Sequence, residues 1–165
     1  MGGAYEFDRV KFQVEKDFQT HYWGRSSVLL QVGYASKDCP VMETFNLLGS
    51  YERFGLYSPG SFATMRESEF FCDRFVSLFL WHDFQGSLWT TNSAWFKPQL
   101  TLSTAMGWGA PTMTQGYFES GFVVKGLLST PFTDLGLGVF YRYGPYANPK
   151  VFDNFAFKYS ITFAL

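Results

Sequence analysis

The sequence has no run of about 18 consecutive apolar residues, so it predicts no membrane-spanning helix. Charged residues make up only 16% of the chain, against about 25% in a typical soluble domain. The formal net charge of -1 argues against nucleic acid as a partner. Glycine-rich phosphate loops, zinc-ligand clusters and calcium loops are all missing, so we expect no cofactor and no metal.

Histidine and cysteine are scarce, with two of each. His82 and Asp83 are adjacent, but neighbouring residues of a strand point to opposite faces, which suits a catalytic pair poorly. We therefore expect no enzyme activity. Cys39 and Cys72 permit at most one disulfide. The strand order below places them at opposite ends of a strand, so we predict that they are not bonded.

Aromatic residues are abundant, at 21% of the chain, and the C-terminal segment arranges them with strict alternation. Its large residues share one face of a strand, and small or polar residues share the other. This pattern predicts the closing strand of an outer-membrane β-barrel, with the large face toward lipid and the small face toward a polar lumen. The same face is expected to form the C-terminal signal that the barrel assembly machinery binds. That face consists of Phe155, Phe157, Tyr159, Ile161, Phe163 and Leu165.

Similar alternation along the whole chain predicts an all-β fold, an antiparallel transmembrane β-barrel domain over residues 1–165. The segment 74–83 is apolar on both faces, so we expect something to cover its inner face. Charged residues that parity places on inner faces are Glu119, Lys125, Arg142 and Lys158. The eight predicted strands span residues 9–18, 27–35, 43–51, 74–83, 100–108, 117–128, 135–143 and 155–165.

The connections alternate between the two ends of such a barrel. If the chain ends in the periplasm, the external loops are 20–26, 52–73, 109–116 and 144–154. The periplasmic turns are then 36–42, 84–98 and 129–134. Loop 52–73 is the longest, and a loop of that length in a compact fold is usually functional or disordered.

Several segments keep the order and spacing of one known family. They are 64–70 (TMRESEF), 73–79 (DRFVSLF), 117–121 (YFESG), 136–146 (GLGVFYRYGPY) and 153–158 (DNFAFK). Across residues 54 to 165 the chain resembles the C-terminal part of an uncharacterised Bacteroidota outer-membrane family. Full-length members of that family carry a carboxypeptidase-like regulatory domain before a barrel. Their barrel is in turn similar to the sixteen-stranded superfamily of outer-membrane insertases and two-partner-secretion transporters.

This resemblance implies that the sequence holds half of a larger barrel. It also implies that loop 52–73 folds back into the lumen and presents an arginine to the wall. Arg66 occupies the place of that arginine, followed by Glu67 where the superfamily has glycine. A desolvated guanidinium requires a partner, and the inward Glu119 is the candidate we favour. A solvated Arg66 is the alternative, and solvation in a wet lumen also accounts for Lys125, Arg142 and Lys158.

The sequence therefore predicts a non-catalytic outer-membrane protein with a pore, assembly or transport role at the bacterial envelope. Its expected partners are outer-membrane lipid and the barrel assembly machinery. The first alternative is a complete eight-stranded small barrel with a structural or adhesion role. The second is a soluble β-sandwich that binds glycans. No secretion signal precedes the first predicted strand, so we expect a mature or engineered start or part of a longer protein.

Overall fold

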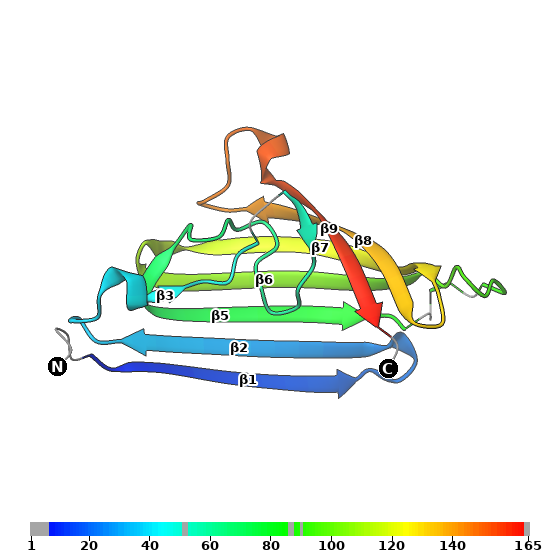
Figure 1. Ribbon diagram of the computed structural model, residues 1–165, viewed down its shortest axis with the longest axis horizontal. Helices are drawn as coiled ribbons and strands as arrows, with labels where there is room; N and C mark the ends of the chain where they lie inside the picture. Colours follow the sequence, from blue (N-terminus) through cyan, green and yellow to red (C-terminus); the bar gives the residue numbers. More distant parts are fainter. Residues whose placement is uncertain (1–6, 51–52, 86–87, 90, 164–165) are drawn as a thin grey trace.

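The computed structural model describes residues 7–50, 53–85, 88–89 and 91–163. The described chain is all-β, as predicted, and its nine strands form one sheet that does not close (Figure 1). The strand order is β1-β2-β5-β6-β7-β8-β9-β4, with β3 paired to β5 beside this path. No helix in this described part is long and apolar enough to cross a membrane.

Seven long strands make up the body of the sheet, and each is antiparallel to its long neighbours. They are β1 (Arg9–Gln19), β2 (Arg25–Ala35), β5 (Phe71–Asp83), β6 (Gln99–Pro111), β7 (Met113–Ser129), β8 (Thr133–Tyr143) and β9 (Phe155–Phe163). The short strands are β3 (Phe45–Asn46) and β4 (Phe54–Leu56), and β4 pairs with β9 in parallel. Three single-turn 3-10 helices complete the elements: η1 (His21–Trp23), η2 (Val41–Glu43) and η3 (Val151–Asn154).

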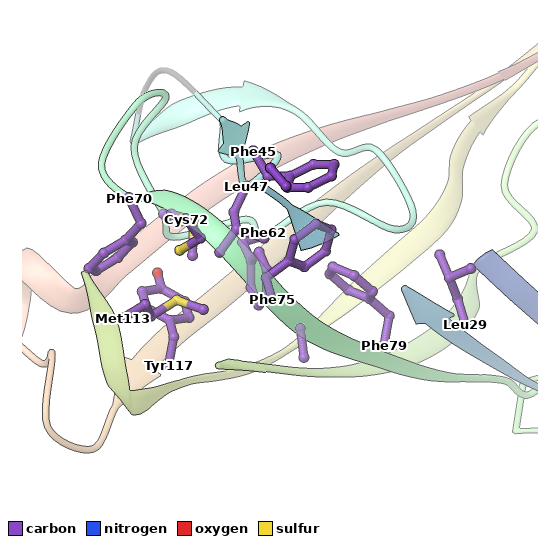
Figure 2. Close-up of a cluster of buried hydrophobic side chains, with 13 residues drawn as sticks. Leu29, Phe45, Leu47, Phe62, Phe70, Cys72, Phe75, Phe79, Met113 and Tyr117 are labelled. Atoms are coloured by element: carbon purple, nitrogen blue, oxygen red, sulfur yellow. The ribbon is translucent and has the colours of Figure 1, made fainter. Parts of the chain in front are cut away.

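The described residues between 36 and 70 leave the sheet after β2 and lie across one of its faces, and the chain returns as β5 (Figure 1). We call residues 36–70 the inner segment and the face that it covers the inner face. Its apolar side chains share one buried cluster with the sheet (Figure 2). The inner segment contributes Phe45, Leu47, Phe62, Met65 and Phe70, and the sheet contributes Leu29, Phe75, Phe79, Ala105, Met113 and Tyr117, among others. This cover explains why residues 74–83 are apolar on both faces.

The two faces of strand β9 have opposite chemistry. On β9, Tyr159 and Ile161 on the outer face are 50% and 45% exposed. Lys158 and Ser160, on the inner face of the same strand, are 1% and 6% exposed. Period-two alternation therefore assigned the faces of β9 correctly. Leu165, the last residue of the predicted C-terminal face, lies outside the described residues.

The predicted wall strand over residues 43–51 is wrong. Strand β2 pairs directly with β5, from Arg25 opposite Asp83 to Tyr34 opposite Arg74, which leaves no place for a strand between them. Phe45 and Leu47, expected on the outer face, are each only 4% exposed and lie in the inner core. Alternation shows that one face of a segment is apolar, but not whether that face meets lipid or a core.

The loss of this strand changes which connections share an end of the sheet. The β1–β2 connection lies at the same end as the β5–β6 and β7–β8 connections, and the inner segment begins at the opposite end (Figure 1). The predicted sides of 20–26 and 36–42 are therefore wrong relative to the other connections. Cys39 packs against the cluster that contains Cys72, and both thiols are free. The reason given from the sequence for two unbonded thiols, a strand length between them, does not hold.

Candidate functional site

Glu119 on β7 holds the backbone of the inner segment. Its side chain points to the inner face, as parity predicted, and is only 2% exposed. One carboxylate oxygen accepts a hydrogen bond from the amide of Ala63 at 2.7 Å. The other accepts bonds from the amide of Thr64 at 2.8 Å and from its hydroxyl at 2.6 Å. A buried carboxylate requires such donors, and Glu119 finds all three in the inner segment.

The hydroxyl of Thr64 connects Glu119 to a second residue of β7. Because Thr64 donates its proton to Glu119, the 2.7 Å contact between Thr64 Oγ1 and Tyr117 has the phenol as donor. Tyr117 is fully buried, so this bond satisfies a polar atom that water does not reach. The chain Tyr117 to Thr64 to Glu119 therefore has a single direction of donation.

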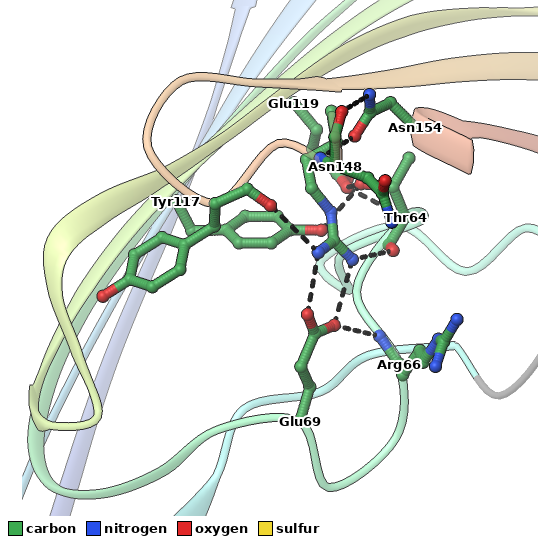
Figure 3. Close-up of polar contacts among 9 residues, drawn as sticks. Thr64, Arg66, Glu69, Tyr117, Glu119, Asn148 and Asn154 are labelled. Atoms are coloured by element: carbon green, nitrogen blue, oxygen red, sulfur yellow. Dashed lines mark hydrogen bonds and ion pairs between the residues drawn. The ribbon is translucent and has the colours of Figure 1, made fainter. Parts of the chain in front are cut away.

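Arg142 on β8 forms the main ion pair between sheet and inner segment (Figure 3). Its Nη1 donates to Glu69 Oε1 at 2.7 Å, and its Nη2 donates to Glu69 Oε2 at 3.0 Å. The same Nη2 also donates to the carbonyl of Thr64 at 2.5 Å. The guanidinium lies over the ring of Tyr117, 4.9 Å from its centroid. This two-point geometry is the strongest that arginine and a carboxylate form.

Strand β9 binds the middle of the inner segment. Lys158 donates from Nζ to the hydroxyl of Ser50 at 2.6 Å, and Ser50 donates to the carbonyl of Ala63 at 2.8 Å. The amide of Phe157 donates to the carbonyl of Arg53, and the amide of Tyr57 donates to the carbonyl of Tyr159, both at 2.7 Å. Three neighbouring strands, β7, β8 and β9, therefore all bind the inner segment.

Two aromatic residues of the inner segment fill the space that remains. The ring centroids of Phe62 and Phe79 lie 4.8 Å apart. A Cβ added at Gly107 would lie only 2.8 Å from the ring of Phe62. The small residue on β6 thus leaves room for Phe62. Tyr57 stacks on Phe140 at 5.3 Å. Burial raises the pKa of the Tyr57 phenol, a hydrogen bond with Ser103 lowers it in part, and the charge of Glu119 raises it further.

The structure does not bring Arg66 to Glu119, so the predicted pair is wrong. The side chain of Arg66 is exposed, and its backbone amide donates to Glu69 at 2.8 Å. Among the described residues, Glu119 has its oxygens occupied by Ala63 and Thr64. The sheet supplies the arginine, Arg142, and the inner segment supplies the acid, Glu69, which is the reverse of the expected arrangement. Phe54 and Leu56 of loop 52–73 lie on β4 and are exposed, whereas Phe62 of the same loop covers Phe79 on β5.

The other inward charges lie as parity indicated. Lys125 on β7 pairs with Asp83 at the end of β5, with Nζ and Oδ2 3.2 Å apart. Both residues line a cavity of about 810 Å³ at that end of the sheet, together with Asp134 and Thr162. At the other end, a cavity of about 320 Å³ borders Arg66 and Arg142.

Sequence reasoning missed Glu69, Thr64 and Ser50. Thr64 and Glu69 lie in a connection without periodicity, so parity gave no direction for their side chains. Ser50 lies in the strand that was wrongly predicted over residues 43–51, so its partner on β9 could not be foreseen. The sequence did contain one indication of these partners. An acid that points inward, such as Glu119, requires hydrogen-bond donors nearby.

Among the residues that the structure describes, no group of three His, Cys, Asp or Glu side chains could hold a metal ion. The contacts of Glu119, Arg142 and Lys158 instead join the sheet to its own inner segment, so their effect is to fix that segment in place. In comparisons with protein-family models, characterised proteins and solved structures, nothing matches this chain.

Proposed function

We propose that this chain forms part of the wall of a β-barrel in the bacterial outer membrane and that the inner segment plugs or braces the lumen. Such a protein serves as a pore, an assembly factor or a transporter at the envelope. The observation that carries the proposal is the set of exposed apolar side chains across the outer face of the sheet, while the inner face buries polar and charged residues beside its apolar core.

A sheet in water buries apolar side chains and exposes polar ones. Here Leu102, Phe122 and Ile161 on the outer face are 45%, 43% and 45% exposed. On the inner face, Thr101 and Glu119 are 1% and 2% exposed. Large apolar side chains in a band across the outer face are stable in hydrocarbon, and buried polar ones are stable facing a filled lumen.

The edge strand β1 also supports a barrel larger than the described sheet. All of its residues are exposed, and in the described chain β2 is its one strand partner. Phe12 and Val14 alternate with Gln13 and Glu15, as in the wall strands. A soluble protein usually blunts a long exposed edge by shortening, twisting or covering it. We propose that another strand of the barrel pairs with β1.

The contacts that β7, β8 and β9 make with the inner segment support its proposed role. Its hydrogen bonds to Glu119, Arg142 and Lys158 hold it across the inner face. A segment held there occupies space that would otherwise conduct water and solutes. The proposed barrel is therefore braced in its resting state and conducts only if the segment moves.

Two neighbouring substitutions on β9 test the membrane location. Ile161→Arg places a charge on the outer face, which costs on the order of 2 to 4 kcal/mol near the middle of a bilayer. Thr162→Arg places the same charge on the inner face, where Thr162 is exposed and borders the cavity with Asp134. We expect the first change to reduce folded, heat-modifiable protein in the outer-membrane fraction and the second to leave it unchanged.

The full-length protein is used for both variants, with wild type in the same cells. Equal losses for the two variants, or wild type released from membranes by urea or carbonate washing, would show that the outer face does not meet lipid.

A further inference from the structure

A serine and a histidine lie opposite one another on the outer face, near the β1–β2 connection. Ser26 on β2 pairs across the sheet with His82 on β5. Ser26 Oγ lies 2.8 Å from His82 Nδ1, and His82 Nε2 lies 2.9 Å from the carbonyl oxygen of Trp23. Both side chains are partly exposed. These are the distances expected for a nucleophile, its base and a group that orients the base.

The contacts fix where the protons lie. A carbonyl oxygen can only accept, so the Nε2 of His82 carries the hydrogen and donates it to Trp23. The Nδ1 of His82 is then the acceptor, and the hydroxyl of Ser26 donates to it. This is the tautomer in which the imidazole can take a proton from the serine.

A second hydroxyl lies beside the serine oxygen. Thr20 Oγ1 is 3.2 Å from Ser26 Oγ. Because Ser26 gives its own proton to His82, Thr20 is the donor in this contact. A donor at this place can stabilise negative charge that develops next to Ser26 Oγ. The ring of Phe84 meets His82 edge to face at 4.5 Å and restricts its rotation.

Ser26 and His82 also line a shallow groove of about 220 Å³ that runs over β2, β5 and β6. Three apolar residues of the groove, Val28, Leu80 and Leu102, lie on the outer face. A groove with this lining fits a hydrocarbon chain, and its polar end is the serine and histidine pair. An ester that joins an acyl chain to a polar group would match both parts.

We propose that Ser26 and His82 form the nucleophile and base of an acyl-ester hydrolase. Ser26 Oγ attacks the ester carbonyl carbon while its proton passes to His82 Nδ1. The carbon–oxygen bond to the alcohol then breaks, and His82 returns the proton to the leaving alkoxide. Water then attacks the acyl-serine while its proton passes to His82. The bond between the acyl carbon and Ser26 Oγ breaks, His82 returns the proton to Ser26, and the carboxylic acid is released.

The sequence predicted no enzyme because His82 and Asp83 point to opposite faces. The partner of His82 lies instead across the strand pair, where sequence spacing does not reveal it. A backbone carbonyl, not a carboxylate, orients His82, so we expect turnover slower than that of a full triad. The choice of a membrane lipid ester as substrate rests on the proposed function, whereas the reactivity of Ser26 does not.

Labelling of the purified, detergent-solubilised protein with a fluorophosphonate tests the nucleophile. We expect an adduct on Ser26, identified by peptide mass spectrometry, that Ser26→Ala abolishes. His82→Gln should slow the labelling at least about 100-fold, because general-base catalysis contributes a factor of this order. Ser120→Ala is the matched control, since Ser120 also lies on the outer face but bonds to Thr104 and Tyr143. It should leave the labelling of Ser26 unchanged.

Failure to label Ser26 in the folded wild type would overturn the proposal, as would equal rates in wild type and His82→Gln. Heat modifiability of each variant separates loss of reactivity from loss of folding. Hydrolysis of p-nitrophenyl acetate and of phosphatidylcholine vesicles is then compared. Activity on both esters supports a lipid hydrolase, and activity on the soluble ester alone overturns the lipid substrate while retaining the nucleophile.

Discussion

Arg142 on the sheet and Glu69 on the inner segment form a two-point ion pair, with nitrogen–oxygen distances of 2.7 and 3.0 Å. The pair is largely shielded from solvent, with 13% and 23% of the two side chains exposed. In this pair the positive charge lies on the sheet and the negative charge lies on the inner segment. The inner segment is held by a cation that belongs to the sheet, so we expect Arg142, and not Arg66, to contribute to its retention.

Arg142→Ala should therefore loosen the inner segment. The change removes hydrogen bonds to Glu69 and Thr64, and a bond to a charged group is worth about 1.5 to 3 kcal/mol. We expect the free energy of opening of residues 53–70 to fall by at least about 1.5 kcal/mol in native-state hydrogen exchange.

Arg66→Ala is the control for Arg142→Ala, because the Arg66 side chain is exposed. It should change the opening free energy by less than about 0.5 kcal/mol. A larger effect at Arg66 than at Arg142 would restore the arrangement predicted from the sequence.

Glu119→Gln keeps the size of the side chain but replaces one acceptor oxygen with an NH₂ group. At least one donor among Ala63 and Thr64 then loses its acceptor in a buried site. We expect a loss of about 1 to 3 kcal/mol in the stability of the inner segment, seen as faster cleavage of residues 53–70 by a protease. Glu15→Gln, on the exposed strand β1, should leave the cleavage rate unchanged. Equal cleavage of both variants would count against the role of Glu119.

Phe62→Ala should destabilise the fold most among the aromatic residues of the inner segment. Phe62 is 1% exposed and contacts Phe79 and Tyr117, so its removal leaves a cavity. Such changes cost about 3 to 5 kcal/mol, which denaturant unfolding in detergent would measure. Phe54→Ala removes a ring that is 56% exposed and should cost much less. Similar costs would show that Phe62 is not part of the core.

The two thiols should differ in reactivity. Cys72 is 0% exposed and lies 3.7 Å from the hydroxyl of Thr112, whereas Cys39 is only partly buried. We expect a maleimide to modify Cys39 in the native protein and Cys72 only after unfolding. Detection of a disulfide between Cys39 and Cys72 in the native protein by non-reducing mass spectrometry would contradict the structure.

Period-two alternation located the long strands because it follows directly from backbone geometry. It placed Glu119, Arg142 and Lys158 on the inner face, where the structure has them. It failed at residues 43–51, where Phe45 and Leu47 alternate as a wall strand does but pack into the inner core. Alternation describes one strand at a time and does not say which strand is its neighbour.

The contacts of the candidate site were less predictable than its faces. Glu119 binds two backbone amides, and every residue except proline offers one, so no sequence signal marks Ala63 or Thr64 as its partners. The resemblance points to Arg66. In the structure, the carboxylate of Glu69 accepts a hydrogen bond from the backbone amide of Arg66 and pairs with the side chain of Arg142. Such choices depend on the path of the loop in space.

The inner segment is hydrogen-bonded to the sheet at two separated strands, to β5 through β3 and to β9 through β4. Three strands, β6, β7 and β8, lie between those attachments. The length of chain from Phe45 to Leu56 therefore sets an upper limit on the distance between β5 and β9. A shorter connection between these two attachments would therefore have to draw β5 and β9 closer together, whereas a longer one would leave their separation to the sheet itself.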